Sequence, residues 1–128
     1  MNILAIDYGT KNIGLAWIDT DVGVVLPYGK MRNDDVGIKE LVALVKREYM
    51  EKIIMGLPIG LDGNENPNTK NIREFVETLK KEIEAPIEFM DERFTSAEAD
   101  RMGDGGASRD EKAAMVILQA YVDRMGAS

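Results

Sequence analysis

Short apolar runs and longer helical patterns divide this chain into successive elements. The first apolar run, residues 3–6, has no polar break and stops at Asp7, which is typical of a strand buried on both faces. A second run, residues 13–18, begins after a short polar turn, so the two runs predict an antiparallel hairpin. Residues 22–28 predict a third strand, in which Pro27 marks the end or an edge position. The chain is therefore expected to open with three strands joined by hairpin turns.

Two later stretches have apolar residues at the spacing of an amphipathic helix. The first runs from about residue 36 to residue 50, and Asn33, Asp34 and Asp35 are its candidate N-caps. The second carries its apolar positions across residues 72–83. Each pattern has one apolar side, so both helices are expected to pack against a sheet.

A short apolar strand follows each of these helices, at residues 52–57 and at residues 87–90. A strand–helix–strand order demands parallel pairing through a crossover helix, whereas the opening hairpins are antiparallel. We therefore expect an α/β fold in one domain, residues 1–128. Its five-stranded mixed sheet should be antiparallel in strands 1–3, continue through parallel crossovers and be flanked by helices. Polar stretches at residues 60–68 and 102–107 predict loops.

The last predicted helix directs one acid toward the core. Ser108 and Glu111 have the spacing of a capping box, which places the start of the helix near Arg109. The apolar stripe of this helix includes Ala114, and Asp110, four residues earlier, shares its side. An acid in a first turn is also favoured by the helix dipole alone. Asp110 is therefore either a partner of the dipole or an inward-facing site residue.

Composition excludes several kinds of chemistry. The chain contains no Cys and no His, so it lacks disulfides, the usual zinc ligands and the usual Ser or Cys triads. A metal site would need a hard ion that prefers oxygen, such as Mg²⁺ or Mn²⁺. No apolar stretch approaches ~18 residues and the N-terminus has no basic leader, which predicts a cytoplasmic protein without a membrane span. The net charge is −7, and residues 82–111 hold ten acids against three bases. This segment is either a solvated acidic face or part of a cation site.

Acidic residues stand at the ends of predicted strands. Asp7 closes the first strand, Asp91 and Glu92 close the last, and Asp110 opens the final helix. In open α/β sheets, functional sites collect beyond the strand ends. Like charges brought together there would raise one another's pKa unless a divalent cation lay among them, so convergence would imply a metal site. Alternatively, Asp7 is only a turn residue that caps the hairpin.

Four spaced motifs resemble those of the YqgF/RuvX family, bacterial proteins of the RNase H-like, RuvC-related nuclease superfamily. They cover nearly the whole chain in order: residues 7–16 (DYGTKNIGLA), Gly56-Leu57-Pro58 with Asp62-Gly63, residues 91–96 (DERFTS), and Asp110 with Ala113-Ala114 and Ile117-Leu118-Gln119. The resemblance implies an RNase H-like fold and a hydrolase, a nuclease that depends on Mg²⁺ or Mn²⁺. Members of the family are described either as nucleases that mature the 5′ end of pre-16S rRNA or as Holliday junction resolvases.

The resemblance also implies a set of catalytic acids. Asp7, Glu92 and Asp110 would bind the metal. Asp91 is the alternative to Glu92, because alternation along the strand places the two acids on opposite faces and apolarity favours neither face.

Three basic residues are candidates for substrate binding. Lys11 would face phosphate alone, because Asn12 stands where the family usually has Arg. Arg93 either grips a phosphate through paired hydrogen bonds or pairs with a neighbouring carboxylate. Arg73 either contacts the nucleic-acid backbone or is a solvated surface residue.

We therefore expect an endonuclease with a role in ribosome biogenesis, through rRNA processing at the 5′ end of pre-16S rRNA. Holliday junction resolution on four-way DNA is the alternative, and a catalytically silent RNA-binding factor for ribosome assembly is a third possibility. The partner is accordingly pre-rRNA or branched DNA, with no membrane involved. A homodimer would suit a two-fold symmetric junction, whereas a monomer suffices to trim one strand.

Overall fold

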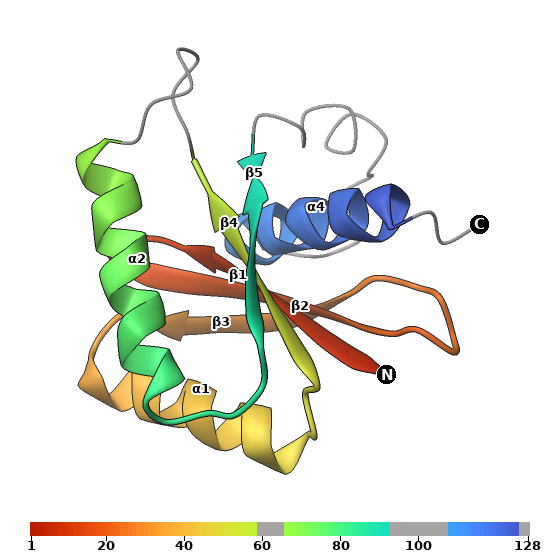
Figure 1. Cartoon of the computed structure of the whole chain (residues 1–128), viewed down its shortest axis with the longest axis horizontal. Helices are drawn as coiled ribbons and strands as arrows, with labels where there is room; N and C mark the ends of the chain where they lie inside the picture. The colour runs from red at the N-terminus through yellow and green to blue at the C-terminus, as the bar shows by residue number, and fades with distance from the viewer. Residues whose placement is uncertain (59–65, 93–107, 126–128) are drawn as a thin grey trace.

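The protein is shown as a computed structural model, of which residues 1–58, 66–92 and 108–125 are described (Figure 1). Its elements in chain order are β1 (Asn2–Tyr8), β2 (Asn12–Asp19), β3 (Leu26–Arg32), α1 (Asp35–Arg47), β4 (Lys52–Leu57), α2 (Pro67–Lys80), β5 (Ile87–Asp91) and α4 (Arg109–Arg124). The strands form one five-stranded sheet in the order β3-β2-β1-β4-β5. β2 pairs antiparallel with β1 and β3, whereas β4 pairs parallel with β1 and β5. The predicted mixed sheet is confirmed.

Helices cover both faces of the sheet and give the molecule three layers. α1 and α2 pack on one face and α4 packs on the other (Figure 1). Leu4 and Ile6 of β1 belong to the core under α1 and α2, whereas Ile3 and Ala5 belong to the core under α4. None of the four is more than 3% exposed. β1 is therefore buried on both faces, as its unbroken apolar run predicts.

The predicted boundaries of the third strand, residues 22–28, are wrong. β3 spans Leu26–Arg32, while Val22 is 67% exposed. The amides of Val22 and Gly23 both donate to one carbonyl at the end of β2, and Gly23 has a φ of 83°, so this stretch forms a turn. Pro27 does lie in an edge strand, where a missing ladder donor is tolerated.

α1 ends three residues earlier than predicted. Its N-cap is Asp34, whose carboxylate accepts the Gly37 amide at 2.8 Å. At the other end Tyr49 adopts a left-handed conformation with a φ of 52°. The Met50 amide then donates to the Val45 carbonyl at 3.0 Å, which closes the helix in a Schellman motif.

Side chains also cap the other two helices. Asn66 accepts the Thr69 amide at 3.1 Å and starts α2 inside the stretch predicted as a loop. Ser108 and Glu111 form the predicted capping box of α4, with hydrogen bonds of 3.0 Å and 3.2 Å. Residues 59–65 and the loop predicted at residues 102–107 lie outside the described residues. Within the described part of the chain, every helix is too short or too polar to cross a membrane.

Candidate active site

Asp7 lies at the C-terminal end of β1, on the face of the sheet that α4 covers. Ile3 and Ala5 point to this face, and strand alternation places Asp7 with them. β2 continues the same face, because Asp7 pairs in register with Gly14. The half-buried Asp7 carboxylate is therefore directed toward α4 and away from α1 and α2.

Gly14 lets the start of α4 approach the sheet beside Asp7. A Cβ built on Gly14 would collide with the carbonyl oxygen of Asp110, so only glycine leaves room for the helix backbone here. Asp110 is half-buried, and Ala114, one turn later, is 0% exposed. Asp110 thus opens α4 on its sheet-facing side, as the helical stripe predicts.

Glu92 approaches the same face from the end of β5. Gly56 of β4 pairs with Met90, whose side chain belongs to the core under α4. A Cβ built on Gly56 would lie 3.2 Å from the carboxyl group of Glu92, so this carboxyl group rests over the backbone of β4. Asp91 alternates to the opposite face of β5. Of the two acids that the sequence left open, Glu92 is thus the one that shares a face with Asp7.

The acids influence one another's protonation. Burial, and secondly the charge of Asp110, raise the pKa of Asp7 to about 6. Burial, and then the charges of Asp7 and Asp91, raise the pKa of Glu92 to about 7. Asp7 is therefore coupled to both Asp110 and Glu92. On this face the ionised form of each raised acid is disfavoured by its surroundings.

These carboxylates suit a hard divalent cation. Mg²⁺ and Mn²⁺ prefer oxygen ligands, and a cation among the acids would remove the repulsion that raises their pKa. In residues 1–58, 66–92 and 108–125, no three acids stand close enough to form a complete ligand cluster. Mg²⁺, however, often takes only one or two carboxylates and completes its shell with water and phosphate oxygens. A pair of acids that includes Asp7 would meet that need.

The turn between β1 and β2 presents Lys11 at the same end of β1. Lys11 is exposed, and its carbonyl accepts the Asn33 amide at 2.8 Å. The Asn33 side chain donates to the Gly9 carbonyl, also at 2.8 Å. Asn33 is therefore not the helix cap considered from the sequence, but a residue that ties this turn to the end of β3. Nothing in its sequence context distinguishes it from the neighbouring cap candidates.

Neither arginine candidate is placed beside Asp7 as Lys11 is, among the residues that the structure describes. Arg73 lies on α2, on the face opposite α4, with its guanidinium carbon 5.0 Å from the ring centroid of Phe89. The structure therefore does not bring Arg73 to the face that holds Asp7. Arg93 lies outside the described residues, and its role stays a prediction.

Comparison with known proteins assigns the chain to a family. A family model described as "RuvX: Holliday junction resolvase" matches residues 1–124. This chain belongs to the RuvX family. The resemblance carried by its sequence motifs is thereby confirmed.

Relatives of this RuvX-family chain match over nearly their whole length. A protein of Dictyoglomus turgidum is 36% identical over 135 residues, which cover 98% of this chain and 96% of the relative. A protein of Maridesulfovibrio salexigens is 34% identical over 134 residues, which cover 97% of this chain and 99% of the relative. Both relatives bear the name "Putative pre-16S rRNA nuclease".

Solved structures share the fold of the RuvX-family chain. RuvC of T. thermophilus, determined in complex with Holliday junction substrate, aligns with a TM-score of 0.69 at 12% identity, over 99% of this chain and 97% of RuvC. The Fowlpox virus resolvase, in complex with Holliday junction DNA, aligns with a TM-score of 0.57 at 14% identity, over 98% of this chain and 99% of the resolvase. At these identities the likeness establishes a common fold, and the expected RNase H-like architecture is confirmed.

Proposed function

We propose that this RuvX-family chain is a nuclease that requires Mg²⁺ or Mn²⁺ and hydrolyses phosphodiester bonds in structured nucleic acid. One observation carries the proposal: Asp7 and Glu92 form a half-buried pair on the face of the sheet where Gly14 admits Asp110, and their pKa values are raised to about 6 and about 7. Stability alone does not favour such a pair, because each ionised group is disfavoured where it lies, and perturbed groups of this kind cluster at functional sites. The relatives' names favour pre-16S rRNA as the substrate, and we assign to the protein the maturation of the 5′ end of this RNA in the cytoplasm.

The acids would share one task. Asp7, Glu92 and Asp110 are the candidate ligands, and Asp7 would hold the cation with one of the other two, to each of which it is coupled. When bound, a divalent cation supplies activation of water and neutralisation of the charge that develops on the phosphate. The chain's own part is to keep these carboxylates partly dehydrated and near one another, so that the cation replaces their protons. Gly14 and Gly56 serve this arrangement by letting α4 and Glu92 reach the sheet.

We assign substrate binding to three cations. Lys11 would contact phosphate beside Asp7, from a turn that Asn33 holds in place. Arg93, the next residue in the sequence after Glu92, would also bind phosphate. Arg73 would contact the substrate from the opposite face of the sheet.

Holliday junction resolution is the second candidate function. The matching family model carries that description, and RuvC shares the fold. A junction has two-fold symmetry and would call for a homodimer, whereas one pre-rRNA strand needs only a monomer. The two candidates therefore also differ in the oligomeric state expected of the active protein.

Cleavage of two substrates tests the proposal. A pre-16S rRNA fragment with a 5′ extension and a synthetic four-way DNA junction are each incubated with the protein in Mg²⁺, Mn²⁺ or EDTA. The wild type is expected to cut the rRNA fragment in either metal and to be inactive in EDTA. Asp7→Asn is expected to slow cleavage at least about 100-fold, because it removes a charged ligand of the cation.

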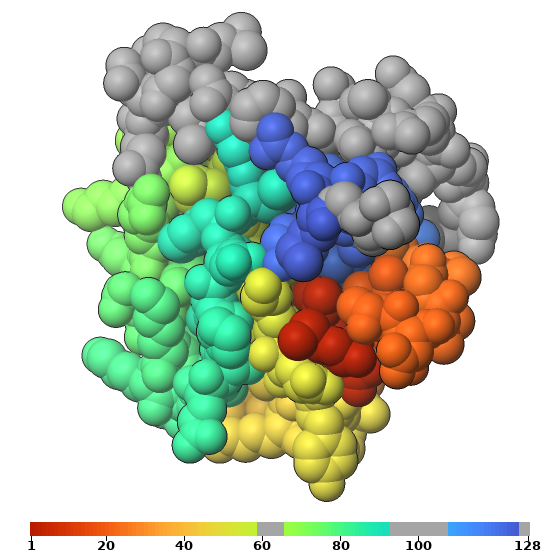
Figure 2. Space-filling model, turned by 45° about the vertical axis from the view of Figure 1, so that its right-hand side comes forward, coloured from red at the N-terminus to blue at the C-terminus, as the bar shows by residue number. Residues whose placement is uncertain are grey.

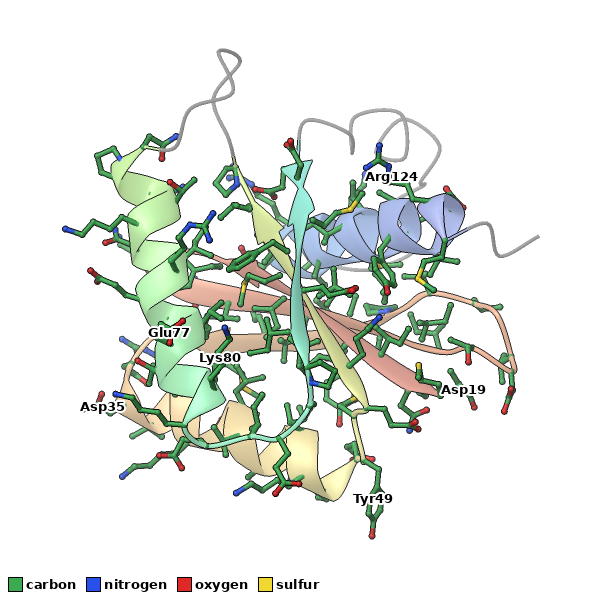
Figure 3. The ribbon with its side chains drawn as sticks, viewed as in Figure 1. Asp19, Asp35, Tyr49, Glu77, Lys80 and Arg124 are labelled. Atoms are coloured by element: carbon green, nitrogen blue, oxygen red, sulfur yellow. The ribbon has the colours of Figure 1, made fainter. Side chains whose placement is uncertain are left out.

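Asp19→Asn is the matched control. Asp19 also ends a strand, but it pairs with Asn2 at the other end of β1 (Figure 3). This variant should cut at the wild-type rate. Equal cleavage rates for Asp7→Asn and the wild type would rule out the proposed site. Faster cleavage of the junction than of the rRNA would make junction resolution the favoured function.

A further inference from the structure

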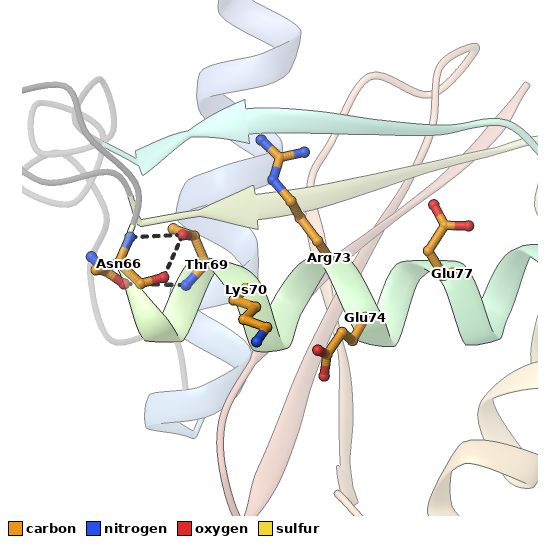
Figure 4. Close-up of a pocket in the computed structure, with 6 residues that line it drawn as sticks. All are labelled: Asn66, Thr69, Lys70, Arg73, Glu74 and Glu77. Carbon is orange, nitrogen blue, oxygen red and sulfur yellow. Dashed lines mark hydrogen bonds between the residues drawn. The ribbon is translucent and has the colours of Figure 1, made fainter.

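An arginine and an aromatic ring meet at the outer edge of the sheet. Phe89 of β5 is 36% exposed, and the Arg73 guanidinium lies over its ring, 5.0 Å from the centroid. Arg73 belongs to the lining of a pocket along α2, and Figure 4 shows its side chain reaching from the helix toward β5. This pair is not part of the acid site, because Phe89 faces α2 and the acids face α4.

The pair is nevertheless close to the acid site along the chain. β5 is an edge strand, and Figure 2 shows it at the surface between α2 and α4. Glu92 follows Phe89 by three residues, which is about 10 Å of strand and equals the rise of about three stacked nucleotides. A nucleic-acid strand held at Glu92 can therefore pass around the edge of the sheet and reach the pair.

We propose that Arg73 and Phe89 form a stacking site for an unpaired base of the substrate, a few nucleotides from the cleaved bond. The proposal rests on the proposed nuclease function. Guanidinium planes and aromatic rings are the groups on which proteins stack splayed bases, and such stacking tolerates any base because each has a π-face. A duplex keeps its bases within its own stack, so the site favours a substrate with a single-stranded segment beside the cut.

Charge around the pair argues for a base and against a longer track of phosphates. Glu77 lies one turn beyond Arg73 and pairs with Lys80 at 3.6 Å. Glu74 lines the same pocket as Arg73. Lys70 lines that pocket too, so Glu74 and Glu77 offset Lys70 and Lys80, and α2 offers phosphates no unbroken row of cations beyond Arg73. The site is therefore expected to bind one or two bases.

Equilibrium binding tests the proposal independently of cleavage. Fluorescence anisotropy is measured in Ca²⁺, with the RNA checked intact on a gel, for three RNA ligands: a duplex with a single-stranded overhang, the same duplex with blunt ends, and the overhang duplex with abasic overhang sugars. The wild type is expected to bind the first ligand more tightly than the other two. Arg73→Lys, which keeps the charge, and Phe89→Leu, which keeps an apolar side chain, should each weaken binding of the first ligand about 5- to 30-fold. Binding of the other two ligands should change less than twofold.

Two further variants keep the test decisive. Arg47→Lys on α1 is the matched control and should bind all three ligands as the wild type does. Phe89→Tyr retains the ring and should restore the binding that Phe89→Leu loses. If Phe89→Leu does not fold, Arg73→Lys carries the test. The proposal is overturned if the wild type shows no preference for the base-bearing overhang, or if Arg73→Lys weakens all three ligands equally or matches Arg47→Lys.

Discussion

At the scale of single residues, the fold disfavours the ionised form of Asp7 and of Glu92. Their pKa values of about 6 and about 7 compare with 3.8 and 4.5 for the same groups without the fold. Between about pH 4 and pH 7 the folded chain therefore binds more protons at these groups than the unfolded chain. By linkage, their contribution to stability is complete below pH 4 and is lost as the pH rises through 6 and 7.

We expect the metal-free protein to lose about 2 kcal/mol of unfolding free energy between pH 5 and pH 8, after the two raised pKa values are discounted for partial exposure. Ordinary carboxylates are already ionised in this range, so the loss reports Asp7 and Glu92. Urea unfolding in EDTA, followed by circular dichroism at the two pH values, measures it. Constant or rising stability over this range would contradict the coupling of the two acids.

Asp7→Asn and added Mn²⁺ identify the source of that loss. The variant should lose less stability than the wild type between pH 5 and pH 8, because one raised acid is gone and Glu92 loses one of its two charged neighbours, keeping Asp91. Millimolar Mn²⁺ should stabilise the wild type at pH 8 more than at pH 5, since metal and protons compete for the same oxygens.

The sequence predicts the position of two acids but not of the third. An unbroken apolar run leads to Asp7, and a helical stripe leads back to Asp110. The strand before Asp91 and Glu92 carries apolar side chains on both faces, since Met90 is 5% exposed and Phe89 is 36% exposed. Alternation alone therefore could not choose between these acids, and the contact of Glu92 with the backbone of β4 decides which face it shares.

At the scale of elements, α1 ends in a left-handed turn that is occupied by tyrosine and not by glycine. Tyr49 occupies the left-handed position of the Schellman motif with a φ of 52°, where glycine is favoured, and its side chain is 79% exposed. Tyr49→Gly should therefore raise the unfolding free energy by about 0.5–1 kcal/mol, because it removes the cost of the left-handed conformation and gives up little packing. Thermal or urea unfolding measures the gain.

Tyr49→Ala separates backbone from side chain at this position. It removes the same ring but keeps a Cβ in the left-handed region, so no gain is expected. An equal gain from alanine and glycine would show that the ring, and not the backbone conformation, limits the stability of this helix end.

Glu111 fastens the helix that carries Asp110. Its carboxylate accepts the Ser108 amide at 3.0 Å and also a backbone bond from Gly29 of β3, and these bonds, the Ser108 bond above all, lower its pKa despite partial burial. Glu111→Ala should cost about 1 kcal/mol of stability and weaken Mn²⁺ binding about 3- to 10-fold, because Asp110 loses its support. Isothermal titration with Mn²⁺ and urea unfolding measure the two effects.

Glu40→Ala is the control for Glu111→Ala. Glu40 is an exposed acid of α1, and its removal should change neither quantity beyond error. Glu111→Gln should fall between the wild type and alanine, since an amide oxygen still accepts one backbone bond. Loss of stability with unchanged Mn²⁺ binding would contradict a link between Glu111 and Asp110.

Periodicity predicts most of the elements, and it fails where the backbone decides. The capping box of α4 was evident from two residues at the correct spacing. The turn before β3 was not, because Val22 and Val24 read as strand residues while the bonds to the end of β2 fold them into a turn. The early end of α1 was hidden for the same reason, since tyrosine gives no sign of a left-handed conformation.

At the scale of the molecule, an acidic chain has to bind a polyanion. The net charge is −7, and the cations assigned to the substrate are Lys11, Arg73 and Arg93. Affinity from neutralised phosphates should accordingly be modest and should depend on few contacts. The cation held by the acids would then contribute to binding as well as to cleavage.

The salt dependence of binding tests this picture. At constant free Ca²⁺, the logarithm of Kd for a single-stranded RNA should rise with the logarithm of KCl concentration with a slope of about 1.4, as expected for the phosphate contacts of Lys11 and Arg93, since Arg73 is assigned to a base. Lys11→Gln should lower the slope by about 0.7, whereas Lys39→Gln on α1 should not change it. A wild-type slope above about 5 would mean that many more cations contact phosphate than Lys11 and Arg93, and would contradict this assignment.

The packing of α4 against the sheet beside β1 has a consequence for the order in which the acids meet during translation. Asp7 emerges before the other two acids, and the helix that brings Asp110 over Gly14 is the last one described. At about 5–20 residues per second, translation separates Asp7 and Asp110 by about 5–20 s, and domains fold as units once their parts have emerged. A nascent chain therefore carries Asp7 and Glu92 before Asp110 has emerged. The fold itself therefore keeps the three acids from meeting on one face of the sheet until α4 has left the exit tunnel.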